Sequence, residues 1–531
     1  MKRNIRALTI LLGVVLTNLI LWVLTNQPVT PRDSRYPIYS LSFNPYQRDH
    51  DPFERVALSE DDLRRDLEKV ATKTNHIRLY TSMGGLEYIP RIAAEYDVRV
   101  IASAWLDART DNNYLEVDAA IKLASENPNI IRVILGNETQ LHGNVPREEL
   151  VEHLNKARKR LRTPVSTAEP WDFWINNPDF VENVDFIAIH ILPYWQEIPL
   201  ERAVDYVIEK YRAVKERFPN KMVMIAETGW PSDGPQRGGS EATLANQAKF
   251  IREFIRQAGA LRIPYNIIEA FDQPWKHATE GRAGEHFGIM DAYRNEKFSL
   301  AGAVLEDPNW EYWALSSTII GFLAIGFFFL RKHRIKSFTK LFAAVIIQGA
   351  VTLSVRLAQT ASGEYMSPSE IVFWSIMLAA QALLAVIILT DTSEIADVVG
   401  RKPLRRQFTP LDPKRAGEFP MVSIHLACCS EPPELVIATL NSLAELDYPN
   451  YEVVVVDNNT KDENLWKPVE ARCKELGSHF RFFSLGKWPG YKAGALNYAL
   501  RATNPEAKYV GVVDADYIVR PEWLRSTIPY F

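Results

Sequence analysis

Two glutamates stand at the ends of apolar runs in the first half of this 531-residue chain. Glu138 follows the run IIRVILGN, and Glu227 closes the run MVMIAE. A pair of carboxyl groups can break a glycosidic bond, because one protonates the leaving oxygen while the other, ionised, attacks the anomeric carbon. A single glutamate at a strand end is more often a solvated or capping residue, so the interpretation requires the two to meet. A retaining pair must stand about 5 to 5.5 Å apart.

A second set of acidic residues follows apolar runs near the C-terminus. Glu431 comes after MVSIHL, Asp457 after EVVVV, and Asp514 and Asp516 after YVGVV. Alternate carboxylates after a buried strand can hold a divalent cation that neutralises a diphosphate leaving group. An isolated Asp-x-Asp is usually a surface turn. Three acidic strand ends in order favour an α/β domain that binds a nucleotide at its strand C-termini.

Composition excludes other classes of function. Lys and Arg number 61 against 65 Asp and Glu, a formal net charge of −4, so the basic surplus that nucleic-acid binding requires is missing. Cys428, Cys429 and Cys473 all lie late in the sequence, so no disulfide framework can hold the first half together. No CxxC or HExxH motif is present, which argues against a structural or protease zinc site.

Four apolar runs fit a bilayer whose hydrocarbon core is about 30 Å thick. The first is favoured as an uncleaved anchor over a signal peptide, because it exceeds the usual signal core and no Ala-x-Ala-like site follows it. The third run is marginal for a span, and a buried globular helix is its alternative. The runs are residues 7–24, 312–330, 341–355 and 371–390.

Basic residues set the expected topology. Lys2, Arg3 and Arg6 precede the first run, five Lys or Arg lie within 331–340, and Arg401 follows the last run closely. Positive loops stay on the cytoplasmic side, so we expect a multi-pass protein of the inner (cell) membrane with a periplasmic first domain and a cytoplasmic second one. The expected segments are a tail (1–6), an anchor (7–25), a periplasmic domain (27–312), three transmembrane helices (313–391), a linker (392–420) and a cytoplasmic domain (421–531).

The periplasmic segment has the pattern of a (β/α)₈ TIM barrel. About 285 residues separate the first two spans, close to the usual barrel length of about 250. Eight short apolar runs alternate with helical, charged stretches, and the catalytic residues of such barrels lie where the strands end. The runs are IYSLSF, HIRLYTS, VRVIASAW, IIRVILGNE, TPVSTAE, VDFIAIH, MVMIAETGW and YNIIEAF.

Residues 38–300 resemble glycoside hydrolase family 17, the β-1,3-glucanases and glucanosyltransferases, through IRLYTS, ILGNET, AETGWPS and EAFDQPWK. The resemblance implies a retaining mechanism without a cofactor, with Glu138 as general acid/base and Glu227 as nucleophile. It also implies that Asn137 binds the sugar beside the cleaved bond. The chain departs from plant members, which carry Asn-x-Tyr-Pro on the sixth strand, because HILPY begins here at His190.

Aromatic residues follow the predicted strand ends. Flat rings can stack on sugar C–H faces and form a glycan groove, with Asp272 and Lys276 as hydroxyl partners, and barrel packing is the alternative for any single ring. The aromatic residues at the strand ends are Trp105, Trp171, Trp174, Tyr194, Trp195, Trp230, Phe271 and Trp275. The expected substrate-binding residues are Asn137, Tyr80, Trp105, Tyr194, Trp230, Phe271 and Trp275.

The C-terminal segment resembles glycosyltransferase family 2, the processive synthases, through ACCSEPPELVIATLNSL, VVVVDNNT, YKAGALNYAL and VVDADY. The resemblance implies a truncated GT-A-like domain that uses UDP-glucose with Mg²⁺ or Mn²⁺. Glu431 and Asp457 would contact the nucleotide, and Lys492 would lie near the donor. Asp514 and Asp516 would handle the UDP-sugar, Asp516 binding the metal. The chain stops at Phe531, before the family's Thr-Glu-Asp-like base and Gln-x-x-Arg-Trp motif, so we expect it not to polymerise sugar alone.

Together the two resemblances point to bacterial cyclic β-(1,3)/(1,6)-glucan synthases. We expect the exported barrel to cleave and transfer β-1,3-glucan or its oligosaccharides, and the cytoplasmic domain to use UDP-glucose at a lipid bilayer. Hydrolysis and transfer both remain open, because they differ only in whether water or sugar attacks the glycosyl-enzyme. The alternatives are a membrane-anchored endo-β-1,3-glucanase with a non-functional transferase remnant, and a non-catalytic glycan-binding anchor.

Overall fold

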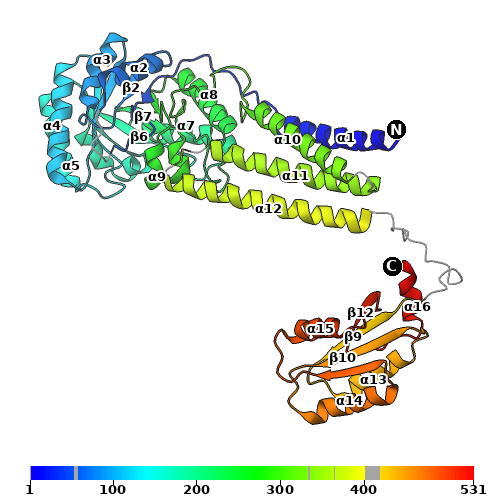
Figure 1. Cartoon of the computed structure of the whole chain (residues 1–531). Coiled ribbons are helices and arrows are strands. Elements are labelled where there is room, and N and C mark those ends of the chain that lie inside the picture. The colour runs from blue at the N-terminus through cyan, green and yellow to red at the C-terminus, as the bar shows by residue number, and fades with distance from the viewer. Residues whose placement is uncertain (1, 53–57, 333–334, 364, 367, 401–418) are drawn as a thin grey trace. The chain divides into compact units, whose positions relative to one another are not determined.

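The computed structural model describes residues 2–52, 58–332, 335–363, 365–366, 368–400 and 419–531. It divides into two compact units, Met1–Arg401 and Lys402–Phe531 (Figure 1). Each unit is described by itself. Of the expected linker 392–420, residues 392–400 are helical and 401–418 lie outside the described residues.

The first unit contains a closed barrel of eight parallel strands in sequence order, as the sequence predicts. β1 pairs with both β2 and β8, which closes the sheet. All eight predicted apolar runs contain a strand, because each alternates residues facing the barrel interior with residues facing the surrounding helices. The strands are β1 (Leu41–Ser42), β2 (His76–Arg78), β3 (Arg99–Ala104), β4 (Ile130–Asn137), β5 (Val165–Pro170), β6 (Phe186–His190), β7 (Met222–Thr228) and β8 (Tyr265–Ile267).

Helices follow the strands and cover the outside of the barrel. In α8 the Thr243 hydroxyl accepts from the Asn246 N–H at the helix start, a side-chain cap that satisfies one of the free amides. The helices are α2 (Glu60–Ala71), α3 (Ile89–Glu95), α4 (Thr110–Glu126), α5 (Arg147–Arg160), α6 (Trp171–Asn176), α7 (Leu200–Arg217), α8 (Leu244–Leu261) and α9 (His277–Glu285). Short 3₁₀ turns are η1 (Leu86–Tyr88), η2 (Pro178–Asn183) and η3 (Pro274–Lys276).

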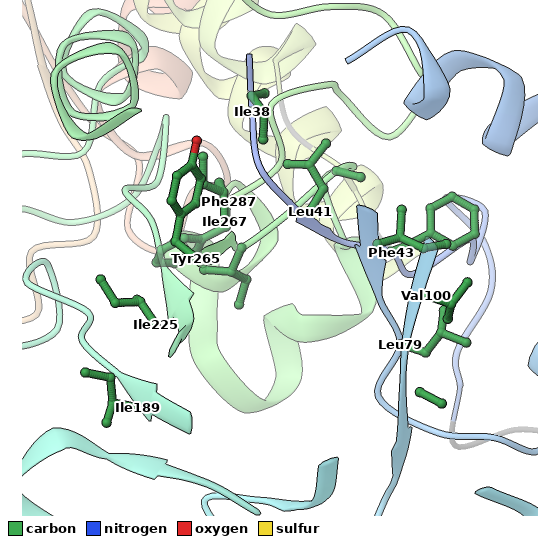
Figure 2. Close-up of a cluster of buried hydrophobic side chains, with 14 of the residues drawn as sticks. Ile38, Leu41, Phe43, Leu79, Val100, Ile189, Ile225, Tyr265, Ile267 and Phe287 are labelled. Atoms are coloured by element: carbon green, nitrogen blue, oxygen red, sulfur yellow. The ribbon is translucent and has the colours of Figure 1, made fainter. Parts of the chain in front are cut away.

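Apolar side chains fill the barrel on both sides of the sheet. A small cluster occupies one set of strand positions and includes Ile101, Ile134 and Met224. A much larger cluster joins the strands to the helices. Figure 2 shows part of the larger cluster, with Ile38, Leu41, Phe43, Leu79, Val100, Ile189, Ile225, Tyr265, Ile267 and Phe287 labelled. This packing fixes the strand ends relative to one another, which any site built there requires.

Four helices of the first unit are long and apolar enough to cross a membrane. The marginal 341–355 run belongs to a 26-residue helix, because the polar and charged residues on either side of it, Lys340 and Arg356 included, are helical as well. The helices are α1 (Lys2–Thr25), α10 (Trp310–Arg331), α11 (Ser337–Ser362) and α12 (Pro368–Gly400). α1, α10 and α11 pack together through Leu11, Val15, Ile325, Phe329, Ala344 and Ile347.

A polar cluster lies inside this helix packing. The buried Asn18 amide donates to the hydroxyls of Ser317 at 3.1 Å and Thr318 at 3.2 Å, and its carbonyl accepts from Thr352 at 2.9 Å. Asn18 therefore joins α1 to both α10 and α11. Among apolar helices such bonds give association its specificity, because lipid tails compete equally well for apolar contacts.

The second unit is a four-stranded parallel sheet in the order β11-β10-β9-β12. Three strands match the predicted runs, and β11, with the half-exposed residues of its FRFFS run, was not predicted. The strands are β9 (Val422–Cys428), β10 (Tyr451–Asp457), β11 (Phe480–Ser484) and β12 (Tyr509–Asp514). The helices are α13 (Pro433–Ala444), α14 (Glu463–Leu476), α15 (Tyr491–Ala502) and α16 (Trp523–Thr527), with the turn η4 (Ile528–Tyr530) at the end.

We predict that Asn18→Ala weakens the assembly of α1 with α10 and α11 by about 1 kcal/mol, the usual value of a hydrogen bond between membrane helices. Unfolding of the full chain in mixed micelles by increasing detergent denaturant measures this loss. Thr9→Ala is the matched control, because the exposed Thr9 hydroxyl bonds only the Ile5 carbonyl of its own helix. Equal stability of the two variants would contradict the prediction.

Candidate active site of the barrel and nucleotide site of the second unit

Glu138 and Glu227 lie at the same end of the barrel, at the C-terminal ends of β4 and β7. Asn137 is the last residue of β4 and Glu138 follows it, while Glu227 is the next-to-last residue of β7. The Glu138 backbone has a φ of 54°, the left-handed region that non-glycine residues rarely adopt and that clusters at functional sites. Its N–H donates to the Ala168 carbonyl at 2.8 Å, which fixes this turn against β5.

Gly136 allows the β4 end to turn in this way. Its φ is 84°, and a Cβ built on it would come within 2.8 Å of the Thr139 side chain. Any larger residue would therefore push the loop that carries Glu138 out of place.

One histidine lies between the two glutamates. His190, the last residue of β6, has its Nδ1 2.8 Å from Glu138 Oε1 and its Nε2 3.6 Å from Glu227 Oε1. The two carboxylates thus flank the opposite nitrogens of a single imidazole ring. The sequence identified His190 only as a departure from the plant pattern, and its position between strands four and seven could not be read from spacing.

Arg78 of β2 is buried beneath this group with 0% of its side chain exposed. Its Nη1 donates to Glu227 Oε1 at 2.9 Å and to the Ala226 carbonyl at 2.9 Å, and its Nη2 donates to Asn137 Oδ1 at 2.6 Å. Nη1 also lies 3.4 Å from His190 Nε2. A carboxylate only accepts, so the hydrogen bond to an ionised Glu138 requires a proton on His190 Nδ1.

These contacts set the charge of Glu138. Burial alone would raise its pKa, but the hydrogen bond from His190, with the charges of His190 and His142, holds the pKa below its ordinary value. Glu138 is therefore ionised in this arrangement, the opposite of the protonated state expected of a proton donor. Its side chain is 21% exposed, whereas that of Glu227 is 5% exposed.

A second buried ion pair lies on the loop after β8. Lys276 Nζ donates to Glu269 Oε1 at 2.5 Å, and the Asn44 amide donates to Glu269 Oε2 at 2.8 Å. Burial alone would lower the pKa of Lys276, but the negative charges around it, of Glu269 first and also of Glu227, raise it. The sequence predicted Lys276 as a sugar hydroxyl partner, and the structure commits its ammonium group to Glu269 instead.

A third glutamate supports the loop that carries Glu138. Glu169 of β5 is fully buried and accepts from the Thr139 hydroxyl at 3.0 Å and from the Gln140 N–H at 3.0 Å. Its pKa is raised by burial. A glutamate ending the apolar run TPVSTAE was the only signal for it in the sequence, the same signal that Glu138 and Glu227 gave.

The predicted aromatic groove is only partly retained. Tyr194, Trp230 and Phe271 have 0% exposure and belong to the barrel core, so packing, the alternative weighed for each ring, accounts for them. Their polar tips find protein partners too, since the Tyr194 hydroxyl donates to the Pro235 carbonyl and Trp230 Nε1 to the Glu241 carbonyl. Of the other predicted rings, Trp174 is fully buried in the core as well, whereas Tyr80, Trp105, Trp171, Trp195 and Trp275 are partly exposed. The Arg78 guanidinium lies 4.8 Å from the centre of the Tyr80 ring.

In the second unit the predicted acidic residues gather at the C-terminal edge of the sheet. Asp457 ends β10 and Asp514 ends β12, while Lys492 at the start of α15 forms an ion pair with Asp514. Asp457 Oδ1 accepts from the Thr460 hydroxyl at 2.6 Å, and its Oδ2 is buried without a hydrogen-bond partner among the described residues. Burial raises the pKa of Asp457, and the nearby Glu431 charge adds to this. An unpaired acceptor of this kind suits a ligand N–H.

The carboxylates described at this edge do not form a metal site by themselves. Within the described ranges, no three His, Cys, Asp or Glu side chains form a group that could hold a metal ion. Asp514 and the exposed Asp516 supply carboxylate oxygens, the ligands that Mg²⁺ and Mn²⁺ prefer, and diphosphate oxygens of a bound donor would complete such a set.

Two family models match the chain. Residues 40–288 match the BtgE/BtgC glycoside hydrolase domain, and residues 423–531 match glycosyl transferase family 2. The barrel and the parallel sheet occupy these two ranges.

Individual proteins are similar to the barrel segment. The glucan 1,3-beta-glucosidase of Schizosaccharomyces pombe is 29% identical over 262 residues, which cover 45% of this chain and 80% of that protein. The probable glucan endo-1,3-beta-glucosidase btgC of Aspergillus fumigatus is 24% identical over 274 residues, 45% of this chain and 39% of that protein. A crystal structure of a glycoside hydrolase family 17 beta-1,3-glucanosyltransferase from Rhizomucor miehei is 22% identical, with a TM-score of 0.45 and coverage of 50% of this chain and 98% of that one. The chain therefore matches the BtgE/BtgC glycoside hydrolase domain over its barrel and glycosyl transferase family 2 over its parallel sheet.

Proposed function

We propose that the barrel cleaves β-1,3-linked glucan with retention of configuration and passes the cleaved end to water or to another sugar. The observation that carries this proposal is the pair of carboxylates, Glu138 and Glu227, that flank one imidazole ring at the ends of β4 and β7. The similarity of residues 40–288 to a glucan-active hydrolase family supports the choice of substrate.

Two displacements make up the reaction. A Glu227 oxygen attacks the anomeric carbon, the glycosidic C–O bond breaks, and the proton of Glu138 goes to the leaving oxygen. Glu138, now a carboxylate, takes a proton from water or from a sugar hydroxyl, whose oxygen attacks the anomeric carbon and releases Glu227. A bound sugar that excludes water from Glu138 would raise its pKa and so favour the protonated form that the first step needs.

Different neighbours contact the proposed nucleophile, Glu227, and the proposed acid/base, Glu138. Arg78 donates hydrogen bonds to both Glu227 and Asn137, which supports Glu227 as the nucleophile with Asn137 beside it. His190 donates to Glu138 Oε1, so the proton of the acid form belongs on Oε2. Asn137, Tyr80, Trp105 and Trp275 are the residues proposed to contact the sugar.

For the second unit we propose use of UDP-glucose. Asp457 and Glu431 would contact the nucleotide, and Lys492 and Asp514 would lie at the donor diphosphate. Asp516, with Mg²⁺ or Mn²⁺, would neutralise the leaving diphosphate. Since α1, α10, α11 and α12 have the length and composition of spans, we propose a multi-pass inner-membrane protein with the barrel periplasmic and the second unit cytoplasmic. Such a chain would make and remodel β-glucan on opposite faces of one membrane.

The two glutamates can be told apart by azide rescue. We predict that Glu138→Ala and Glu227→Ala each lose more than about 10³-fold in turnover of an aryl β-glucoside oligomer, beyond the loss from one transition-state hydrogen bond. Azide should then restore turnover, giving a β-glycosyl azide with Glu138→Ala and an α-glycosyl azide with Glu227→Ala. The exposed Glu182→Gln variant is the control. Full activity of either alanine variant would refute the proposed chemistry.

Product length decides between transfer and hydrolysis. With laminari-oligosaccharides as the only sugar, we expect the full chain to form products longer than the substrate as well as shorter ones. Chromatography of the products against substrate concentration measures the ratio, since acceptor sugar competes with water for the glycosyl-enzyme. If only shorter products form at every concentration, the barrel hydrolyses the glucan and transfer is excluded.

The pH profile tests His190. His190→Phe removes the donor that lowers the pKa of Glu138 and leaves the burial that raises it. Because the acid step needs protonated Glu138, the alkaline limb of kcat/KM should move to higher pH. His190→Asn keeps an N–H toward Glu138 but loses the charge, so it should move the limb less than His190→Phe does. An unshifted limb in both variants would contradict the role of His190 as the group that lowers the pKa of Glu138.

Donor binding tests the second unit separately. We predict that UDP binding to the full chain with Mn²⁺, followed by calorimetry, weakens at least about tenfold in Asp457→Asn, which removes one carboxylate acceptor. Glu470→Gln, on the outer side of α14, is the matched control. Equal UDP affinity in both would contradict the placement of the nucleotide at Asp457.

A further inference from the structure

The connection between α11 and α12 reaches into the barrel. The Tyr365 hydroxyl donates to Asp272 Oδ2 at 3.0 Å, and its own oxygen accepts from the Ala292 N–H at 3.0 Å. Its ring stacks on His286, with ring centres 5.1 Å apart and planes 20° apart. A residue of the candidate membrane hairpin is therefore bound by three residues of the barrel.

The barrel supplies a prepared socket for this tyrosine. Asp272 is buried, and its Oδ1 already accepts from the Gly288 N–H at 2.9 Å and from Lys297 at 2.8 Å. Its Oδ2 faces His286 only at 3.5 Å, so the tyrosine hydroxyl supplies the close donor for that oxygen. A buried carboxylate oxygen without a close donor is costly, which favours occupancy of the socket.

The socket belongs to the loop after β8, which also carries Glu269 and Lys276. In the sequence Asp272 lies between Glu269 and Lys276, which form an ion pair. The charge of Glu227 is among those that raise the pKa of Lys276. A second contact lies nearby in the sequence: Glu370, in the first turn of α12, is 3.8 Å from His277 at the start of α9. The hairpin thus touches the β8 loop and the helix after it.

We propose that Tyr365 is a latch that docks the loop between α11 and α12 into the Asp272 socket and so holds the barrel in one orientation on its membrane helices. The sequence predicted Asp272 as a sugar hydroxyl partner, and the latch gives this buried carboxylate another role. The first family match ends at residue 288 and the second begins at residue 423, so neither covers Tyr365. The proposal stands independently of the reaction proposed for the barrel.

Hydrogen exchange of the full chain in lipid nanodiscs tests the latch directly, because the Ala292 N–H has the Tyr365 hydroxyl as its acceptor. In Tyr365→Phe we expect the peptide containing Ala292 to exchange about tenfold faster, from loss of two hydrogen bonds. Tyr365→Ala, which also removes the stacking on His286, should exchange faster still. Tyr312→Phe, at the exposed start of α10, is the control and should match the parent chain.

Two results would overturn the latch. Unchanged exchange in both Tyr365 variants would mean that Tyr365 does not dock on the barrel when the chain is in a membrane. Equally faster exchange in peptides from β4 and β7 would make Tyr365 a general folding residue rather than a local latch.

A second readout uses the absence of cysteine before residue 428. Ala292→Cys places one thiol at a site that is 3% exposed. We expect slow labelling of this thiol by a membrane-impermeant maleimide, and labelling about tenfold faster when Tyr365→Ala is added. Equal rates in the two backgrounds would contradict the latch.

Discussion

The candidate active site depends on one buried cation. The Arg78 guanidinium has no exposed surface, so its charge must be matched inside the barrel, and Glu227 matches it directly. Its Nη groups also donate to the Asn137 and Ala226 carbonyls, and Nη1 lies 3.4 Å from His190 Nε2. A single side chain from β2 thereby joins one candidate carboxylate, the Asn137 amide and the imidazole that faces the other carboxylate. Removing Arg78 would leave a buried, uncompensated Glu227, a defect usually costing about 3 to 5 kcal/mol.

The strands and the apolar helices could be predicted because each follows from local pattern. Eight short apolar runs spaced by helical stretches define the barrel, and long uncharged runs define α1, α10 and α12. The catalytic candidates could be predicted as well, because a carboxylate at the end of an apolar run is conspicuous. β11 escaped prediction because its residues are only half-buried, which weakens the pattern.

What the sequence could not supply are contacts between distant segments. Arg78 and Glu227 are 149 positions apart, and Tyr365 and Asp272 are 93 apart, so no window of sequence contains either pair. Burial is also a property of the assembled fold. Tyr194, Trp230 and Phe271 follow strand ends as groove residues would, but their rings turn inward to the core. Arg78 itself gave one signal, a charged residue inside the apolar run HIRLY.

The length of α12 has a consequence for how far its end stands from the lipid. A helix of 33 residues is about 50 Å long, whereas the hydrocarbon of a bilayer is about 30 Å thick. Asp391, Glu394 and Asp397 occupy its last turns, and carboxylates are excluded from hydrocarbon. In a bilayer, those turns would therefore lie outside the hydrocarbon, as a helical extension several turns long that remains in water.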